Sequence, residues 1–106
     1  QVYHSTGAYA DTGVNITIGA THNATGPYEF PHCDLEGYCV YTNTPAVGAF
    51  RGYGHQESQF AIERLIDQLA RKLEMSPFEL RRKNYLTPGK VNALGERMWP
   101  TNGDVV

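Results

Sequence analysis

The most regular pattern of apolar and polar positions lies in the middle of the chain and predicts a long helix. Apolar side chains recur there at three- and four-residue steps, with basic and amide side chains largely on the opposite side. Glu57 falls in the expected first turn, where the helix dipole favours an anion, and Asp67 is spaced to pair with Arg71. We therefore expect an amphipathic helix from about Gln56 to Leu73. Its apolar positions are Phe60, Ile62, Leu65, Ile66, Leu69 and Leu73.

A second, shorter helix is predicted directly after the first. Ser76-Pro77-Phe78-Glu79 has the sequence of a capping box with proline at the first helical position. Pro88-Gly89 is expected to end this helix. We expect Phe78, Leu80 and Tyr85 to point inward, and we interpret the basic run beside them as a solvated face or a docking surface. That run is Arg81, Arg82 and Lys83.

The remaining periodicity predicts short strands. Gln1 to Ala10 is compatible with the end of a strand. Val14, Ile16 and Ile18 sit two apart, as on one face of a short strand, and a loop or a helical turn fits them equally. From Cys33 to Thr42, apolar side chains occupy both faces toward the end, as in a strand that is covered on both sides. We therefore predict an α+β fold in which short strands pack with one long amphipathic helix and one short capped helix.

A glycine-rich stretch with one cation and two rings lies between the last predicted strand and the long helix. Its glycines allow positive φ or a close approach of the backbone to a ligand. Arg51 is a permanent cation with a planar fork of donors, and Phe50 and Tyr53 offer ring faces beside it. This combination suits a flat or anionic ligand. Composition alone favours a simple connection, in which Arg51 is solvated and the glycines serve turns. These glycines are Gly48, Gly52 and Gly54.

Composition and charge narrow the classes of function. The 106 residues carry a net charge of −2, so no basic excess points to nucleic acid, and no apolar run is long enough to span a membrane. Cys33 and Cys39 are too few for a disulfide scaffold and match no zinc spacing. We expect both to be buried free thiols in a reducing, cytoplasmic protein.

Few side chains support chemistry of their own. The four histidines are scattered and none pairs with a cysteine or carboxylate at ligand spacing, so we expect no metal site made of side chains. Glu63 and Asp67 lie one helical turn apart, either as a paired-carboxylate site or, as we prefer, as a solvated or salt-bridged pair. A flavin or nicotinamide domain would need a glycine fingerprint that is missing here.

Six separated stretches carry a family resemblance. They are Gly7-Ala8-Tyr9-Ala10-Asp11-Thr12-Gly13, Gly26-Pro27-Tyr28, Thr42-Asn43-Thr44-Pro45, Ala49-Phe50-Arg51-Gly52-Tyr53-Gly54, Phe60-Ala61-Ile62-Glu63 and Arg81-Arg82-Lys83-Asn84. Together they resemble the molybdenum-binding (large) subunit of the xanthine dehydrogenase and aldehyde oxidase family, the molybdenum hydroxylases. Several motifs in compatible order make a strong signal where any one would be weak. The resemblance implies an internal fragment of a molybdopterin-binding domain.

The resemblance also implies a reaction and a site. Members of the family insert a water-derived oxygen into a C–H bond next to a heteroatom, or oxidise an aldehyde, at a molybdenum held by a pterin dithiolene rather than by side chains. By this resemblance Arg51 and Tyr53 would be catalytic residues, and Ala49, Phe50, Arg51 and Gly52 would bind the cofactor. A cation and inward-aimed amides favour an anionic oxo centre, and an aromatic face favours a flat substrate.

Cofactors and partners follow from the same resemblance. We expect molybdopterin, with the cytosine dinucleotide form left open, and iron–sulfur clusters and FAD on other segments or subunits. The partners would be the rest of the molybdenum subunit, the iron–sulfur and FAD subunits or domains, and a small-molecule substrate, with neither nucleic acid nor membrane. Within the single fragment 1–106 we distinguish a strand and loop region 1–47, an active-site loop 48–55, a helical region 56–87 and an irregular tail 88–106. The fragment alone should be inactive, because the family's general-base glutamate lies elsewhere.

Three departures bear on the substrate. Gly52 stands where copper-containing carbon monoxide dehydrogenases carry a cysteine, so it has no sulfur for copper. A gap-free alignment puts Ile18-Gly19-Ala20-Thr21 where animal xanthine-oxidising enzymes have Glu-Arg-Ala-Leu, whose arginine contacts the purine. Gly54-His55-Gln56-Glu57 replaces the usual Gly-x-Pro-Gln. We therefore predict oxidation of an aldehyde or nitrogen heterocycle, with a non-catalytic binding or scaffold module of the same ancestry as the alternative.

Overall fold

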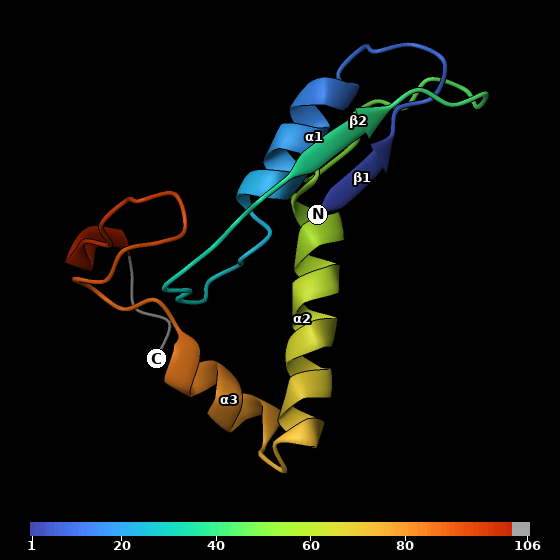
Figure 1. Ribbon diagram of the computed structural model, residues 1–106. Coiled ribbons are helices and arrows are strands. Elements are labelled where there is room, and N and C mark those ends of the chain that lie inside the picture. Colours follow the sequence, from blue (N-terminus) through green and yellow to red (C-terminus); the bar gives the residue numbers. More distant parts are fainter. Residues whose placement is uncertain (103–106) are drawn as a thin grey trace. The chain divides into compact units, whose positions relative to one another are not determined.

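The structure is a computed structural model that describes residues 1–102, so the last four residues of the predicted irregular tail lie outside the described residues. Within residues 1–102, two strands, three α-helices and a short 3-10 helix give a mixed α+β architecture (Figure 1), which confirms the predicted fold class. The chain divides into two compact units, and α2 runs from one into the other: residues 1–24 with 34–60, and residues 25–33 with those from 61 on. The elements are β1 (Val2–Ser5), α1 (Gly13–His22), β2 (Gly37–Val40), α2 (His55–Lys72), α3 (Pro77–Asn84) and η1 (Pro100–Asn102).

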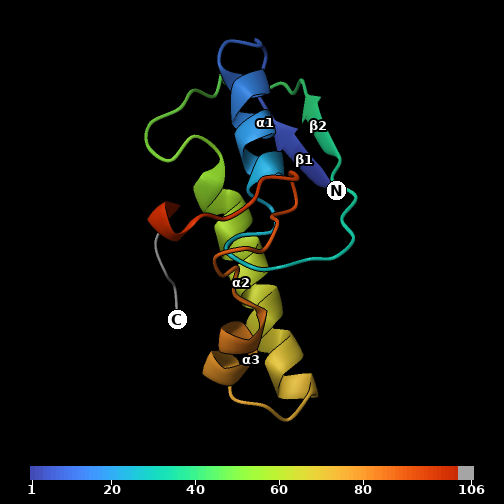
Figure 2. The same ribbon diagram turned by 90° about the vertical axis from the view of Figure 1, so that its left-hand side faces the viewer.

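The first unit is built on a pair of parallel strands with α1 lying along them (Figure 2). β1 and β2 pair in parallel from Val2 opposite Gly37 to Ser5 opposite Val40. A parallel pair needs a crossover connection, and α1 lies within that connection. At Gly37 a Cβ would meet the side chain of Thr21, so the absence of a side chain lets α1 approach β2 closely.

The segment around Val14, Ile16 and Ile18 is a helix, and the strand interpretation of this spacing is wrong. Ile16 is buried, while Val14 and Ile18 are each about half exposed at 47%. The buried positions recur at the spacing of a helix, and most of them are small or hydroxylated residues. They are Gly13, Ile16, Thr17, Ala20 and Thr21. Two of the threonine hydroxyls are satisfied within the helix, because Thr17 and Thr21 donate to carbonyls four residues back, at 3.0 and 2.7 Å.

The second strand is shorter and more exposed than the sequence predicts. Only Gly37–Val40 of the expected span Cys33 to Thr42 is a strand, and all four of its residues are exposed. Cys33 and Cys39 are free thiols, as expected, but both are exposed rather than buried. The rings of Tyr3 and Tyr38 stack across the strand pair with centroids 4.8 Å apart, which adds a cross-strand contact on the open face.

The second unit has its own apolar core, where α3 packs against the C-terminal part of α2 (Figure 1). Its buried members are Tyr28, Ile66, Ala70 and Leu80. Tyr28 comes from the segment before β2 and forms an isolated antiparallel bridge with Tyr85, and their rings stack at 5.5 Å. This core is therefore assembled from the consecutive helices α2 and α3 and from the stretch around Tyr28, which is distant from both in sequence.

α2 matches its predicted range closely, whereas α3 ends at Asn84, before the stop predicted at Pro88-Gly89, and the cap between the two helices also differs. α2 and α3 begin within one residue of their predicted starts. Ser76 occupies the N-cap position of α3 with proline following, yet its hydroxyl makes no capping hydrogen bond, so the predicted capping box does not form. Of the three side chains expected to point inward, Leu80 is buried, Tyr85 is half-buried, and Phe78 is 84% exposed.

Arg81 joins the two helices through an ion-pair network. Its guanidinium lies 2.7 Å from a Glu63 oxygen and 2.9 Å from an Asp67 oxygen, which settles these carboxylates as salt-bridged. Tyr28 donates its hydroxyl to the other Glu63 oxygen at 2.7 Å. Arg81 is therefore part of a packed network, whereas the sequence placed it on a solvated or docking face. Desolvation opposes its charge, but the hydrogen bonds that Arg81 donates to Glu63 and Asp67 outweigh that effect and raise the pKa of Arg81.

Candidate functional site

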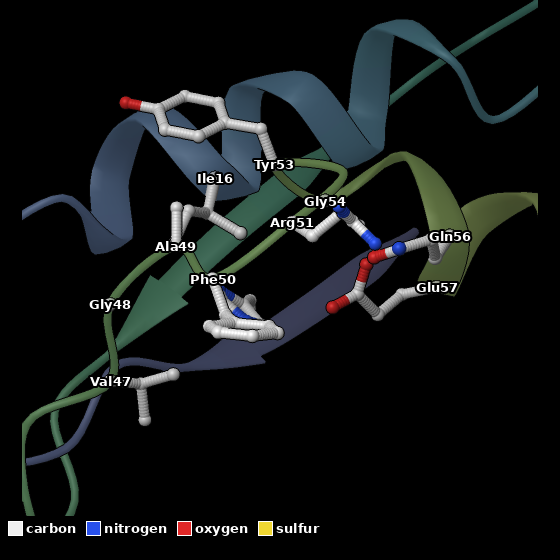
Figure 3. A pocket seen from close by; sticks show the side chains of 11 residues that line it. Ile16, Val47, Gly48, Ala49, Phe50, Arg51, Tyr53, Gly54, Gln56 and Glu57 are labelled. Carbon is white, nitrogen blue, oxygen red and sulfur yellow. The ribbon is translucent and has the colours of Figure 1, made fainter.

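A pocket of about 370 Å³ opens in the first unit beside the glycine-rich loop (Figure 3). Four of the five residues predicted for the site line it, namely Ala49, Phe50, Arg51 and Tyr53. The fifth, Gly52, does not line it, because the side chain of Gln56 lies against its backbone. The other lining residues are His4, Ile16, Val47, Gly48, Gly54, Gln56 and Glu57.

The start of the loop is held by backbone hydrogen bonds to the chain that leaves β1. Ala8 donates its N–H to Thr44 at 3.0 Å, and Val47 donates to Thr6 at 3.2 Å. Gly7, between these two anchors, has a φ of +75°, and a Cβ there would overlap the carbonyl of Pro45. The Gly7 motif noted in the sequence therefore fixes where the loop begins.

The end of the loop is seated directly on α1. Gly52, Tyr53 and Gly54 have φ values of +95°, +53° and +92°, so three consecutive residues adopt the left-handed region. This is unfavourable for an aromatic residue such as Tyr53, at a cost of about 1–3 kcal/mol. A Cβ on Gly54 would overlap the carbonyl of Ile16, and one on Gly19 would overlap the carbonyl of Tyr53. The two glycines let loop and helix backbones touch, and this contact holds Tyr53 in its strained conformation.

The side chains of the loop point in different directions. In Figure 3 the Phe50 ring and the Arg51 side chain lie on the pocket side, while the Tyr53 ring extends over α1, away from Phe50. Phe50 is fully exposed and Tyr53 is 41% exposed. Arg51 forms no ion pair within residues 1–102. The two rings therefore do not sandwich the guanidinium, and the cation is free to meet a ligand.

Five pocket residues were missed by the sequence analysis, and one of them is Val47, which directly precedes the predicted loop 48–55. His4 faces the pocket from β1, and its Nδ1 lies 3.1 Å from the hydroxyl of Thr17. Ile16 comes from α1, which had no clear assignment in the sequence. Gln56 and Glu57 belong to the first turn of α2, immediately after the loop. The altered Gly54-His55-Gln56-Glu57 stretch was the available signal for these last two.

This arrangement suits an anionic group with a flat body. No acceptor among residues 1–102 takes a hydrogen bond from the backbone N–H of Ala49, Phe50 or Arg51, so these donors remain available beside an unpaired guanidinium. Donors and a cation together favour an anion, and the Phe50 ring favours a planar surface.

Within residues 1–102, no three His, Cys, Asp or Glu side chains are grouped to hold a metal ion. No helix there has the length and hydropathy of a transmembrane segment.

Comparison with known proteins identifies the family. The family model for the molybdopterin cofactor-binding domain matches residues 1–85. The chain belongs to this family. Among its relatives, a probable xanthine dehydrogenase component from Bacillus subtilis is 39% identical over 103 residues, which are 97% of this chain and 14% of the relative.

Solved structures similar to this molybdopterin cofactor-binding domain have the same fold. The aldehyde oxidoreductase from Desulfovibrio gigas superposes with a TM-score of 0.79 at 36% identity, over 90% of this chain and 10% of that one. Quinoline 2-oxidoreductase from Pseudomonas putida 86 gives 0.79 at 35% identity, over 92% and 13%. The chain thus spans 10–14% of these three proteins, and the fragment interpretation is confirmed.

Proposed function

We propose that the protein carrying this molybdopterin cofactor-binding domain is a molybdenum hydroxylase that oxidises an aldehyde or a nitrogen heterocycle with water-derived oxygen. Arg51 and Tyr53 act in its active site, and Ala49, Phe50, Arg51 and Gly52 contact the cofactor. The similar proteins include an aldehyde oxidoreductase and a quinoline 2-oxidoreductase, whose names cover both substrate classes. The domain alone is inactive in this proposal.

The main observation behind the proposal is that Arg51 is an unpaired cation on a loop whose backbone is held in place at both ends. Arg51 lacks a carboxylate partner among the described residues, and the neighbouring amides lack acceptors there. Molybdopterin carries anionic groups, so the charge and donors of this loop fit it. The backbone contacts of Gly19 and Gly54 fix the loop before a ligand arrives, which lowers the entropic cost of binding.

Each residue of the loop has a distinct part in the proposal. The cofactor, when bound, supplies the oxidation chemistry. The Arg51 guanidinium holds negative charge by hydrogen bonds and by its own charge. The amides of Ala49 and Phe50 donate to the same anionic group, and Gly52 contributes its backbone, where a side chain would overlap Gln56. The exposed ring of Tyr53 lines the pocket apart from Phe50 and offers a second apolar face to a flat substrate.

The larger assembly forms part of the same proposal. Related sequences bear names such as molybdenum-binding subunit, large molybdopterin subunit and complex subunit gamma, so relatives work as parts of multi-subunit proteins. We propose that the rest of the molybdenum subunit completes the pocket, and that iron–sulfur and FAD subunits or domains accept the electrons. A cytoplasmic location completes the proposal, which leaves the form of the pterin open.

Metal analysis of the full-length protein tests the function. Molybdenum near one atom per chain, with oxidation of an aromatic aldehyde or an N-heterocycle by the same preparation, is the expected result. Incorporation of ¹⁸O from labelled water into the product would support the reaction type. A preparation that is folded, contains no molybdenum when grown with molybdate, and oxidises neither substrate class would support the non-catalytic module instead.

A further inference from the structure

Beyond the proposed cofactor contacts, Glu57 places a carboxylate on the wall of the same pocket. Glu57 lies in the first turn of α2 and lines the pocket together with Phe50 and Arg51. In Figure 3 its carboxylate points from the helix into the pocket, on the side of Phe50 and Arg51. Glu57 forms neither an ion pair nor a side-chain hydrogen bond within residues 1–102, in contrast to Glu63 and Glu29.

A carboxylate in this place is poorly suited to the cofactor itself. An ionised carboxylate only accepts hydrogen bonds, and it repels another anion close by. Arg51 and the loop amides suit the anionic cofactor, whereas the Glu57 carboxylate in the same pocket does not. Glu57 is therefore suited to a second ligand in this pocket, one that presents a hydrogen-bond donor.

The two substrate classes of the proposed function differ in whether they present a hydrogen-bond donor. A simple aldehyde presents only an acceptor oxygen, and it would leave the Glu57 carboxylate without a partner. An N-heterocycle with a ring N–H presents a donor on a planar ring, which also suits the exposed face of Phe50. A hydrogen bond to a charged acceptor is shorter and about twice as strong as a neutral one.

We propose that Glu57 accepts a hydrogen bond from a ring N–H of the substrate, and that the site thereby selects planar nitrogen heterocycles bearing such a donor over aldehydes. Glu57 is a specificity-determining residue in this proposal, and the oxidation does not depend on its charge. The inference rests on the proposed function and narrows its substrate class.

The test compares Glu57→Gln with the wild-type full-length protein on three compounds: an oxo-purine with a ring N–H, its N-methylated counterpart, and an aromatic aldehyde. Glu79→Gln is the matched control, because Glu79 is also exposed in the first turn of its helix, α3, and does not line this pocket. We expect kcat/KM for the N–H compound to fall about tenfold or more in Glu57→Gln, with the other two compounds unchanged within about twofold. Glu79→Gln should match the wild type on all three.

A binding measurement gives a readout that does not depend on turnover. Titration calorimetry of cofactor-free protein with a non-oxidisable heterocycle bearing a ring N–H should show a dissociation constant about tenfold higher in Glu57→Gln. An equal change for all three compounds, or no change in either readout, would overturn the inference and leave the proposed function standing. A wild-type protein that oxidises none of the compounds would overturn both.

Discussion

The carbonyl oxygen of Tyr53 occupies the space that a Cβ on Gly19 would need. This contact joins the end of the candidate active-site loop to the middle of α1, and Tyr53 is held there with a φ of +53°. It also bears on the sequence comparison, because the gap-free alignment places Gly19 where animal xanthine-oxidising enzymes carry an arginine. In this structure an arginine at position 19 would displace the loop.

Replacing Gly19 by alanine should displace the loop in the full-length protein. Helix propensity alone favours alanine in a helix by about 1 kcal/mol, but the overlap with Tyr53 costs about 1–3 kcal/mol. We expect faster amide hydrogen exchange in residues 48–54 and a lower molybdenum content per chain. The control is Asn15→Ala, at an exposed position of the same helix. Unchanged exchange in the loop would show that the contact does not position it.

The sequence predicted α2 and α3 well but not α1, for a physical reason. α2 carries large apolar side chains on one face, so its period is easy to read. α1 buries one large apolar side chain, Ile16, among glycine, alanine and threonine, while Val14 and Ile18 are about half exposed. A helix that packs backbone against backbone needs small side chains, and hydropathy patterns give these little weight. The small residues that let α1 pack closely against the loop 48–55 also made α1 hard to predict from hydropathy.

Replacing Arg81 by methionine should destabilise the second unit. The change leaves Glu63 and Asp67 without their cationic partner, while Tyr28 still donates to Glu63. Both carboxylates remain about one third exposed, so we expect a loss of about 1–2 kcal/mol, less than for a fully buried pair. The rate of hydrogen exchange at the amides of α2 and α3 measures this loss of stability. Arg82→Met, at an exposed neighbouring position, should have little effect, and equal losses in both variants would contradict the network's role.

The ionisation of Tyr28 should make the second unit less stable at high pH. Burial, and then the hydrogen bond and charge of Glu63, raise the pKa of Tyr28 above its ordinary value of 10.0. Above about pH 10 the unfolded phenol therefore loses its proton first, and the free energy of unfolding falls as pH rises. Below about pH 10 the protonated Tyr28 makes its full contribution to the free energy of unfolding.

The Tyr28→Phe variant isolates this effect. Denaturant midpoints at pH 9 and pH 11 should fall more in the wild type than in the variant, because phenylalanine has no proton to lose. Other ionisations act on both proteins equally and cancel in the comparison. An identical drop in the two proteins would mean that the phenol of Tyr28 titrates alike in the folded and unfolded states.

The candidate site was predicted in part, and its remainder depends on tertiary contacts. The loop residues Ala49, Phe50, Arg51 and Tyr53 lie close together in the sequence, so one motif predicted their joint place in a pocket. His4 reaches the pocket only because β1 pairs with β2 and lies beside the loop, which no local pattern encodes. The sequence also placed Arg51 between two rings, but in the structure the rings of Phe50 and Tyr53 point apart (Figure 3).

The central claim is that the free guanidinium of Arg51 belongs to the active site of a molybdenum hydroxylase. Steady-state turnover of full-length Arg51→Ala, with Arg82→Ala as a control at another exposed arginine, tests it most directly. We predict that turnover falls about 10²- to 10³-fold in Arg51→Ala, with an unchanged thermal unfolding midpoint, because the side chain forms no ion pair among the described residues. Turnover within about twofold of the wild type and of Arg82→Ala would contradict the claim.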